Sequence, residues 1–163
     1  MIHLIAAVDG KLGIGRDNDL LCHISADLKR FKALTMDHTI LMGRKTFESL
    51  PGILPGRPHW VLTRQEDYQA DSSAVTVFHS PEAMKLAMAD GEDYFIIGGA
   101  AMYRAFLPLA DSLYLTEIDE VFPDADTFFP EWKSDDWTEI EREVHEKSDS
   151  NKYKFAFVHY VRK

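Results

Sequence analysis

The chain has 163 residues, 45% hydrophobic and 28% charged, which is enough to bury the core of one globular domain. Its net charge of −9 argues against non-specific binding to nucleic acid, and its longest apolar run, residues 2–8, is too short to cross a bilayer. Because the N-terminus lacks the parts of a signal peptide and the single cysteine, Cys22, cannot form an internal disulfide, we expect a cytoplasmic protein.

The first half of the chain predicts strands and helices around a long loop. Residues 2–8 read as a buried strand, and residues 9–24 as a loop of the length typical of a lid. Ser25 can N-cap a helix that carries Leu28, Phe31 and Leu34 on one face. We then expect a strand at 39–42, a short helix at 46–50, a proline-rich loop at 51–58, and strands at 59–63 and 75–78.

The second half begins with a strong helix start at Ser80-Pro81-Glu82, with Gly91 just beyond that helix. A tight turn at Gly98-Gly99 follows a strand at 94–97. Pro108 should end a helix at 101–107, and another strand follows at 113–118. Residues 140–145 and 153–161 alternate in polarity and predict an antiparallel C-terminal pair.

This order predicts an α/β fold in a single domain over residues 1–163. We expect a central, mostly parallel sheet of about eight strands with an antiparallel C-terminal edge, and about four helices on both faces. Ligands of such sheets bind beyond the carboxyl ends of the strands. The loop after the first strand, the helix start after the second, and Gly98-Gly99 should therefore meet in one cleft.

Two glycine-containing segments bear on nucleotide binding. Gly10, Gly13 and Gly15 follow the order GxxGxG, not the GxGxxG that opens into a helix, so a simple Rossmann fold is not favoured. The segment Gly43-Arg44-Lys45-Thr46 combines a helix N-terminus with two cations and a hydroxyl, which suits a phosphate; an ordinary strand–helix turn is an equal alternative. Thr63-Arg64 could add a second cation near it.

The charge distribution agrees with an anionic ligand near the first part of the chain. Residues 1–64 hold nine Lys and Arg against six Asp and Glu, whereas residues 119–150 hold twelve acids against three bases. A cationic segment in an acidic protein suggests a small anionic ligand there, with chance as an equal alternative.

Asp27 is the unusual acid of the sequence, in the first turn of the expected helix and beside its apolar face. A surface acid that favours a helix N-terminus is the simpler explanation. The functional one is a carboxylate in an apolar cleft that binds a planar cationic or amidine-like group by two hydrogen bonds. Apolar burial would raise its pKa and the helix end would lower it.

In the order and spacing of these residues, the chain resembles bacterial dihydrofolate reductases almost from end to end. The matching segments are Leu4-Ile5-Ala6-Ala7, Ile14-Gly15 with Asn18, Ala26-Asp27-Leu28 with Phe31-Lys32 and Thr35, residues 42–49, Leu54-Pro55-Gly56-Arg57, Ile96-Ile97-Gly98-Gly99, Tyr114-Leu115-Thr116 and residues 126–130. The resemblance implies an oxidoreductase of one-carbon metabolism that reduces 7,8-dihydrofolate to tetrahydrofolate with NADPH. It also implies a monomer that binds antifolates and holds no metal.

The resemblance implies substrate roles position by position. The catalytic candidates are Asp27, as the acid that bonds the pterin, its partner Thr116, and the lid residues Leu20 and Cys22. Arg57 would bind the carboxylate of the glutamate tail, which suits a guanidinium. Residues matching the remaining substrate contacts, each of which alone could be plain core, are Ile5, Ala6, Leu28, Phe31, Leu50, Leu54, Ile97 and Tyr103.

The cofactor positions follow in the same way, and Gly98-Gly99 resembles the cis glycine pair of the family. The residues implied to contact NADPH are Ala7, Ile14, Gly15, Gly43, Arg44, Lys45, Thr46, Leu62, Thr63, Arg64, Ile97, Gly98, Gly99, Ala100, Ala101, Met102 and Tyr103.

Two departures from the family pattern concern the lid. The family usually reads Leu-Pro-Trp where this chain reads Leu20-Leu21-Cys22, and the missing tryptophan affects the ordered water beside the acid and the rigidity of the lid. Ala125 stands where the enteric form has glycine, in a loop that packs on the lid. Two other functions stay open: a riboflavin-pathway reductase of the same fold, against which Asp27 and Arg57 argue, and a catalytically weak folate- or antifolate-binding protein.

Overall fold

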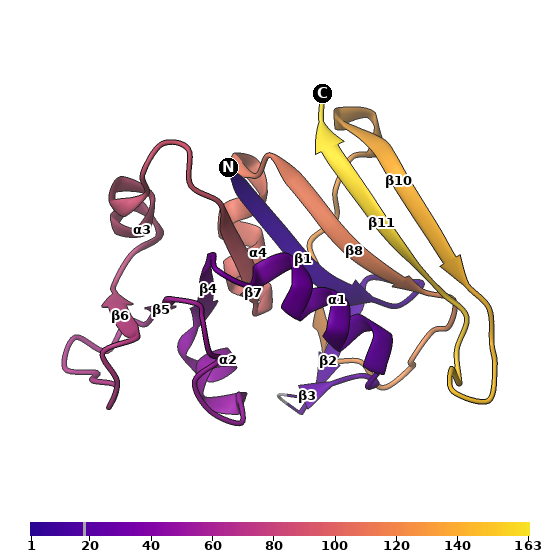
Figure 1. Cartoon of the computed structure of the whole chain (residues 1–163), viewed down its shortest axis with the longest axis horizontal. Helices are drawn as coiled ribbons and strands as arrows, with labels where there is room; N and C mark the ends of the chain where they lie inside the picture. The colour runs from indigo at the N-terminus through magenta and orange to yellow at the C-terminus, as the bar shows by residue number, and fades with distance from the viewer. Residues whose placement is uncertain (18) are drawn as a thin grey trace.

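The centre of the molecule is one eight-stranded sheet, in the order β10-β11-β8-β1-β7-β4-β5-β6 (Figure 1). The computed structural model describes residues 1–17 and 19–163; Asn18, in one of the matching segments, lies outside them. The strands are β1 (Ile2–Val8), β4 (Thr39–Gly43), β5 (His59–Leu62), β6 (Val75–Phe78), β7 (Tyr94–Gly98), β8 (Ser112–Ile118), β10 (Trp137–His145) and β11 (Phe155–Arg162). The six strands from β8 to β6 run parallel to one another, and β11 pairs antiparallel with both β8 and β10. This pattern confirms the predicted mixed sheet.

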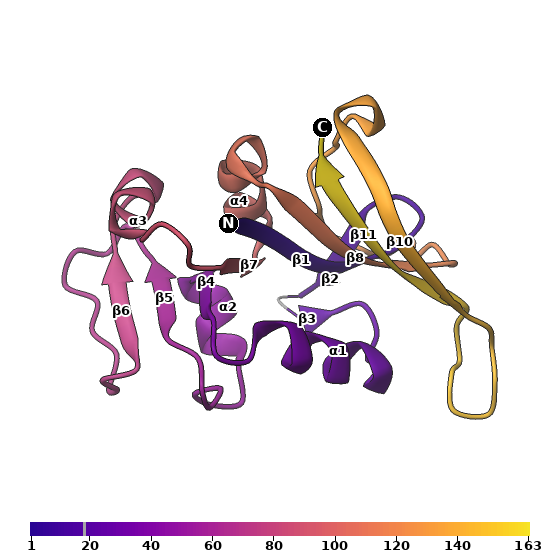
Figure 2. The same ribbon diagram turned by 45° about the horizontal axis from the view of Figure 1, so that its top comes forward.

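In the described part of the chain, four α-helices cover the sheet, as the sequence predicts: α1 (Ser25–Thr35), α2 (Arg44–Ser49), α3 (Pro81–Ala87) and α4 (Ala100–Phe106). Figure 2 shows α1 and α2 on one face and α3 and α4 on the other. Two short 3-10 helices, Leu107–Leu109 and Ser134–Asp136, follow α4 and precede β10. The predicted cap of α3 is present, because the hydroxyl of Ser80 accepts the N–H of Ala83 at 3.1 Å.

The start and the buried face of α1 differ from the prediction. Its N-cap is Ile24, whose carbonyl accepts the N–H groups of Asp27 and Leu28, and no side chain caps it. Leu28 is 53% exposed, while Phe31 and Leu34 pack against the core. Successive steps of three residues drift around a helix, so Leu28 lies roughly 120° away from Leu34 and points off the sheet.

The segment after β1 is not the continuous loop that the sequence predicts. It contains β2 (Gly13–Arg16) and β3 (Asp19–Leu20), which form a small sheet with β9 (Thr127–Phe128) in the order β3-β2-β9. Antiparallel pairing of β2 with β9 joins the lid to the segment after β8. Strands of two to four residues carry no periodic signal of their own.

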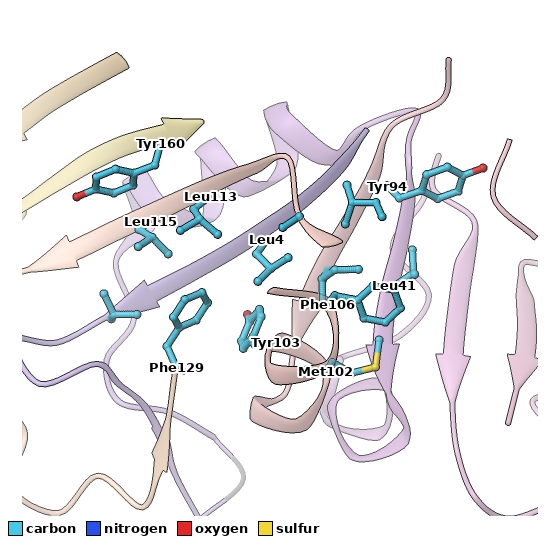
Figure 3. Packing of buried hydrophobic residues seen from close by; sticks show 14 of the residues in the cluster. Leu4, Leu41, Tyr94, Met102, Tyr103, Phe106, Leu113, Leu115, Phe129 and Tyr160 are labelled. Atoms are coloured by element: carbon cyan, nitrogen blue, oxygen red, sulfur yellow. The ribbon is translucent and has the colours of Figure 1, made fainter. Parts of the chain in front are cut away.

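Alternating side chains of the central strands divide the core between the two faces. On the α4 face, Leu4 and Leu113 pack with Met102, Phe106 and residues around them (Figure 3). On the α1 and α2 face, Ile5 begins a second cluster with Ile40, Met42, Val61 and Phe95. The sheet therefore presents a separate apolar layer to the helices on each side.

Candidate active site

Asp27 and Thr116 meet where the first turn of α1 crosses β8. The Thr116 hydroxyl donates a hydrogen bond to Oδ1 of Asp27, and Thr116 is only 2% exposed. Burial raises the pKa of the Asp27 carboxyl, whereas the Thr116 hydrogen bond and the positive charge of Arg30 lower it. The structure thus contains a mostly buried carboxylate with one oxygen bonded to a neutral donor.

Arg30 is a residue of this site that the sequence analysis missed. It lies one helical turn after Asp27, and its guanidinium carbon is 4.6 Å from the ring centroid of Phe157 and 5.5 Å from that of Tyr114. Burial lowers the pKa of this guanidinium, and the charge of Asp27 raises it. The i, i+3 spacing of the two charges is a signal that could have identified the pair.

Cys22 lies at the end of the lid, close enough for the Asp27 charge to act on it. Burial and that charge raise the pKa of the thiol. Cys22 packs against the cluster of Ile118, Phe155 and Phe157. Beside it is a cavity of about 310 Å³ lined by residues 21–24, residues 150–153 and Phe155. The structure therefore has open space next to the position at which the family usually carries tryptophan.

Most residues expected to form the substrate walls are gathered in one cluster on the α1 and α2 face: Ile5, Phe31, Leu50, Leu54 and Ile97. Exposed Leu28 lies on the same helix but outside that cluster, and half-exposed Leu20 of β3 belongs to none of the buried clusters. Ala6 packs on the opposite, α4 face.

Tyr103 is buried on the α4 face, and burial raises the pKa of its hydroxyl. That hydroxyl donates to the carbonyl of Ile5 at 2.7 Å. Met102 beside it is also core, and a Cβ placed on Gly43 would lie 3.8 Å from its Cγ. Both side chains therefore pack against β1 and β4 on the α4 face of the sheet, opposite the apolar cluster on the α1 and α2 face.

Arg57 is a buried cation, 6% exposed, in the loop before β5. Its Nε donates to the carbonyl of Pro55 and its NH1 to the hydroxyl of Thr35, each at 3.1 Å. Among the residues that the structure describes, no carboxylate forms an ion pair with it. The guanidinium is thus held in place without neutralisation of its charge.

Most of the expected cofactor residues lie at or just after the carboxyl ends of three adjacent parallel strands, β7, β4 and β5. Gly43 and Gly99 are the N-caps of α2 and α4, and no side chain among the residues that the structure describes caps the first N–H groups of either helix. The Gly98-Gly99 peptide is cis, as the resemblance implies, and a Cβ on either glycine would lie 3.5 Å from Oγ1 of Thr46. Backbone donors from two helix starts therefore lie at one edge with a threonine hydroxyl.

Three cationic side chains lie near the carboxyl ends of these strands. Lys45 and Arg64 are exposed, and Arg44 pairs with Glu48 at 2.8 Å. Thr63 is buried, and its hydroxyl accepts the N–H of Gln65 at 3.1 Å. Free amides, hydroxyls and cations form the donor set that phosphate groups require, so the residues present fit a phosphorylated nucleotide such as NADPH.

The other expected cofactor positions are spread over several surroundings. Leu62 and Ala100 are half-buried and Ala101 is exposed, while Ala7 and Ile14 are half-buried near the start of the lid. The carbonyl of buried Gly15 accepts the N–H of Asp126 at 3.0 Å.

The lid is tied to the loop after β8 by a buried carboxylate that the sequence analysis also missed. Oδ1 of Asp9 accepts the N–H groups of Lys11 and Gly13 at 2.8 and 2.7 Å, and its Oδ2 accepts that of Phe122 at 3.0 Å. A Cβ on Gly13 would lie 2.8 Å from Oδ2 of Asp9 and 3.0 Å from Cβ of Ala125. The methyl group of Ala125 is therefore accommodated because residue 13 is glycine.

No helix in residues 1–17 and 19–163 has the length and apolar character needed to span a membrane. The same residues contain no group of three or more His, Cys, Asp or Glu placed to hold a metal ion.

Comparisons with known proteins agree over nearly the whole chain. A family model described as dihydrofolate reductase matches residues 1–162. Dihydrofolate reductase type 3 of Salmonella typhimurium is 43% identical over 158 residues, 97% of this chain and 96% of that protein. Dihydrofolate reductase of Bacillus subtilis is 39% identical over 163 residues, 100% of this chain and 95% of that protein.

A solved structure gives the same result for the fold. Dihydrofolate reductase from Enterococcus faecalis, complexed with NADP(H) and RAB-propyl, superimposes with a TM-score of 0.90 at 37% identity, and the match covers 100% of this chain and 96% of that one. Fold and site together define an NADP-dependent α/β oxidoreductase. Within that class, the chain belongs to the dihydrofolate reductase family, and its reaction is the reduction of dihydrofolate to tetrahydrofolate with NADPH. The family match decides against the riboflavin-pathway reductase.

Proposed function

We propose that Asp27 is the residue of this chain that holds the pterin ring during dihydrofolate reduction and supports its protonation. The observation that carries the proposal is the partly buried carboxylate bonded to Thr116. A carboxylate can accept two parallel N–H bonds from a ring nitrogen and its exocyclic amino group. Its raised pKa brings it closer to the range in which a carboxyl group works as an acid at neutral pH.

The apolar cluster around Ile5, Phe31 and Ile97 forms the walls against which the flat substrate rings lie. Such walls align the substrate and exclude bulk water, which strengthens the hydrogen bonds to Asp27. Leu28 of α1 lies outside this cluster, but its side chain is exposed and therefore available to contact the substrate.

Arg57 binds the glutamate tail of the substrate. A guanidinium has five N–H donors, and two of them are used by Pro55 and Thr35. The remaining donors are positioned by those two bonds, so a tail carboxylate finds a cation that is already oriented. Arg57 therefore also favours binding of a folate, which has a glutamate tail, over a pterin that lacks one.

NADPH supplies the hydride when it is bound. The first N–H groups of α2 and α4 and the hydroxyl of Thr46 hold its diphosphate, and Arg44 with Arg64 hold the 2′-phosphate. Ala7 and Ile14, near the start of the lid, contact the nicotinamide end. We further propose a cytoplasmic monomer, folded as a single domain over residues 1–163, that also binds antifolate inhibitors.

A steady-state assay of NADPH oxidation with dihydrofolate tests these assignments together. Replacing both Arg44 and Arg64 by methionine should raise the KM for NADPH and leave that for NADH nearly unchanged. An equal loss with both cofactors would show that the arginines do not recognise the 2′-phosphate. Binding of dihydrofolate without turnover by the wild-type chain would instead favour the catalytically weak binding protein.

A further inference from the structure

His59, the first residue of β5, makes two hydrogen bonds to the loop that carries Arg57. Its ring is completely buried. Nδ1 lies 2.7 Å from the carbonyl oxygen of Arg57, and Nε2 lies 3.1 Å from the backbone nitrogen of Leu54. The imidazole therefore links the backbone of Leu54, a residue of the apolar wall, to the backbone of Arg57, the residue proposed to bind the glutamate tail.

The chemistry of the two partners fixes the protonation of the ring. The backbone N–H of Leu54 can only donate, so Nε2 must offer a lone pair. The carbonyl of Arg57 can only accept, so Nδ1 must carry the proton. The neutral Nδ1–H tautomer satisfies both bonds, whereas a doubly protonated ring would place two N–H groups against each other at Leu54.

The surroundings of the ring favour its neutral form. Phe47 of α2 packs edge-on, with ring centroids 6.3 Å apart, and the residues paired with His59 on β4 and β6 are Ile40 and Val75. These three side chains are uncharged, and within residues 1–17 and 19–163 the charged group that acts on the ring is Arg57. Burial and the Arg57 charge lower the pKa of His59, and its bond to the Arg57 carbonyl raises it.

We propose that neutral His59 is a positioning residue that fixes the backbone of Leu54 and Arg57 and thereby sets the affinity for the glutamate tail. The proposal rests on the role proposed above for Arg57. It goes beyond that role because it adds a proton-dependent element: protonation of His59 breaks the Leu54 bond and releases the loop. Tail recognition should then weaken in acid, while recognition of the pterin ring should not.

Three variants separate the two bonds. His59→Asn places an amide nitrogen near the position of Nδ1 and can keep the hydrogen bond to the Arg57 carbonyl. His59→Gln places an amide oxygen near the position of Nε2 and can keep the hydrogen bond from the Leu54 N–H. His59→Phe keeps neither bond. His145→Asn, on β10, is the matched control. The measurements are kcat and KM for dihydrofolate and for a dihydropterin that lacks the tail, across acid and neutral pH.

We expect His59→Phe to raise the KM for dihydrofolate by roughly two- to tenfold, the scale of one neutral hydrogen bond. Its kcat and its KM for dihydropterin should stay near wild type, and Asn or Gln should restore part of the loss. In the wild type, the ratio of the two KM values should rise as the pH falls below 6.5, the ordinary pKa of histidine. In His59→Phe this ratio should not depend on pH.

The outcomes distinguish this proposal from the one on which it rests. If Arg57→Leu abolishes discrimination between the two substrates and folded His59→Phe retains it at every pH, the role of His59 is wrong and that of Arg57 stands. If both variants retain discrimination, both roles are wrong. Nitrogen NMR of the wild-type imidazole provides a measurement that needs no variant: an Nε2–H tautomer or a charged ring at neutral pH would overturn the proposal.

Discussion

Replacing Thr116 by valine should raise the pKa of Asp27 and shift the pH dependence of hydride transfer with it. Valine keeps the branched shape of threonine inside the buried contact and removes the donor to Oδ1. A hydrogen bond to a charged group contributes about 1.5–3 kcal/mol, which is the stabilisation that the ionised carboxylate would lose. The pKa of the carboxyl should therefore rise, with the charge of Arg30 still present.

Single-turnover hydride transfer, measured from acid to alkaline pH, gives the readout. If Asp27 supports protonation of the pterin, the rate declines as the carboxyl loses its proton, and the midpoint of that decline should move to higher pH in the variant. Thr138→Val, on the exposed strand β10, should leave the midpoint unchanged. A folded Thr116→Val variant with the wild-type midpoint would show that the ionisation of Asp27 does not govern the rate.

Three other changes have defined outcomes. Asp27→Asn should lower turnover by about 10²–10⁴-fold. It should nevertheless raise the thermal unfolding midpoint of the ligand-free protein at neutral pH, because the ionised carboxylate destabilises the fold above its raised pKa and the neutral amide does not. Below that pKa the carboxyl is protonated in the wild type as well, so the difference in unfolding midpoint should vanish in acid. Gly13→Ala should cost about 1–3 kcal/mol in urea unfolding by overpacking, and Ala125→Gly should recover part of it; strictly additive effects would exclude the contact. Cys22→Trp should fill the cavity beside the lid with an apolar side chain and raise the neutral-pH hydride rate. An unchanged pH profile would show that the lid already compensates.

The sequence predicts those parts of the fold whose signal is local. Residues 2–8 and 75–78 form strands with the predicted bounds because each is a short, β-branched run. The start of α3 follows from Ser80 and Pro81. The β2–β9 pairing could not be predicted in this way, because it joins very short segments more than a hundred residues apart.

The same distinction holds for the candidate site. The contact between Asp27 and Thr116 follows from the family resemblance, and the structure contains it. Arg30 and His59 were missed because each reads as an ordinary polar residue in its own segment. Arg30 acquires its surroundings from aromatic rings on β8 and β11, and His59 from the backbone of a neighbouring loop. Tertiary contacts of this kind have no periodicity in the sequence.

The place of β1 in the sheet also has a consequence for synthesis of the protein. Among the strands of this sheet, β1 is synthesised before the others and lies between β7 and β8, so its earliest partner in the sheet begins at residue 94. Until then, an apolar strand has both hydrogen-bonding edges unpaired, the condition in which nascent chains associate wrongly. Pairing across such sequence separations also makes folding slow. We therefore expect truncated chains that end before β7 to aggregate or to remain bound to chaperones, and the pterin and cofactor ends of the site to form together, late, in a single step.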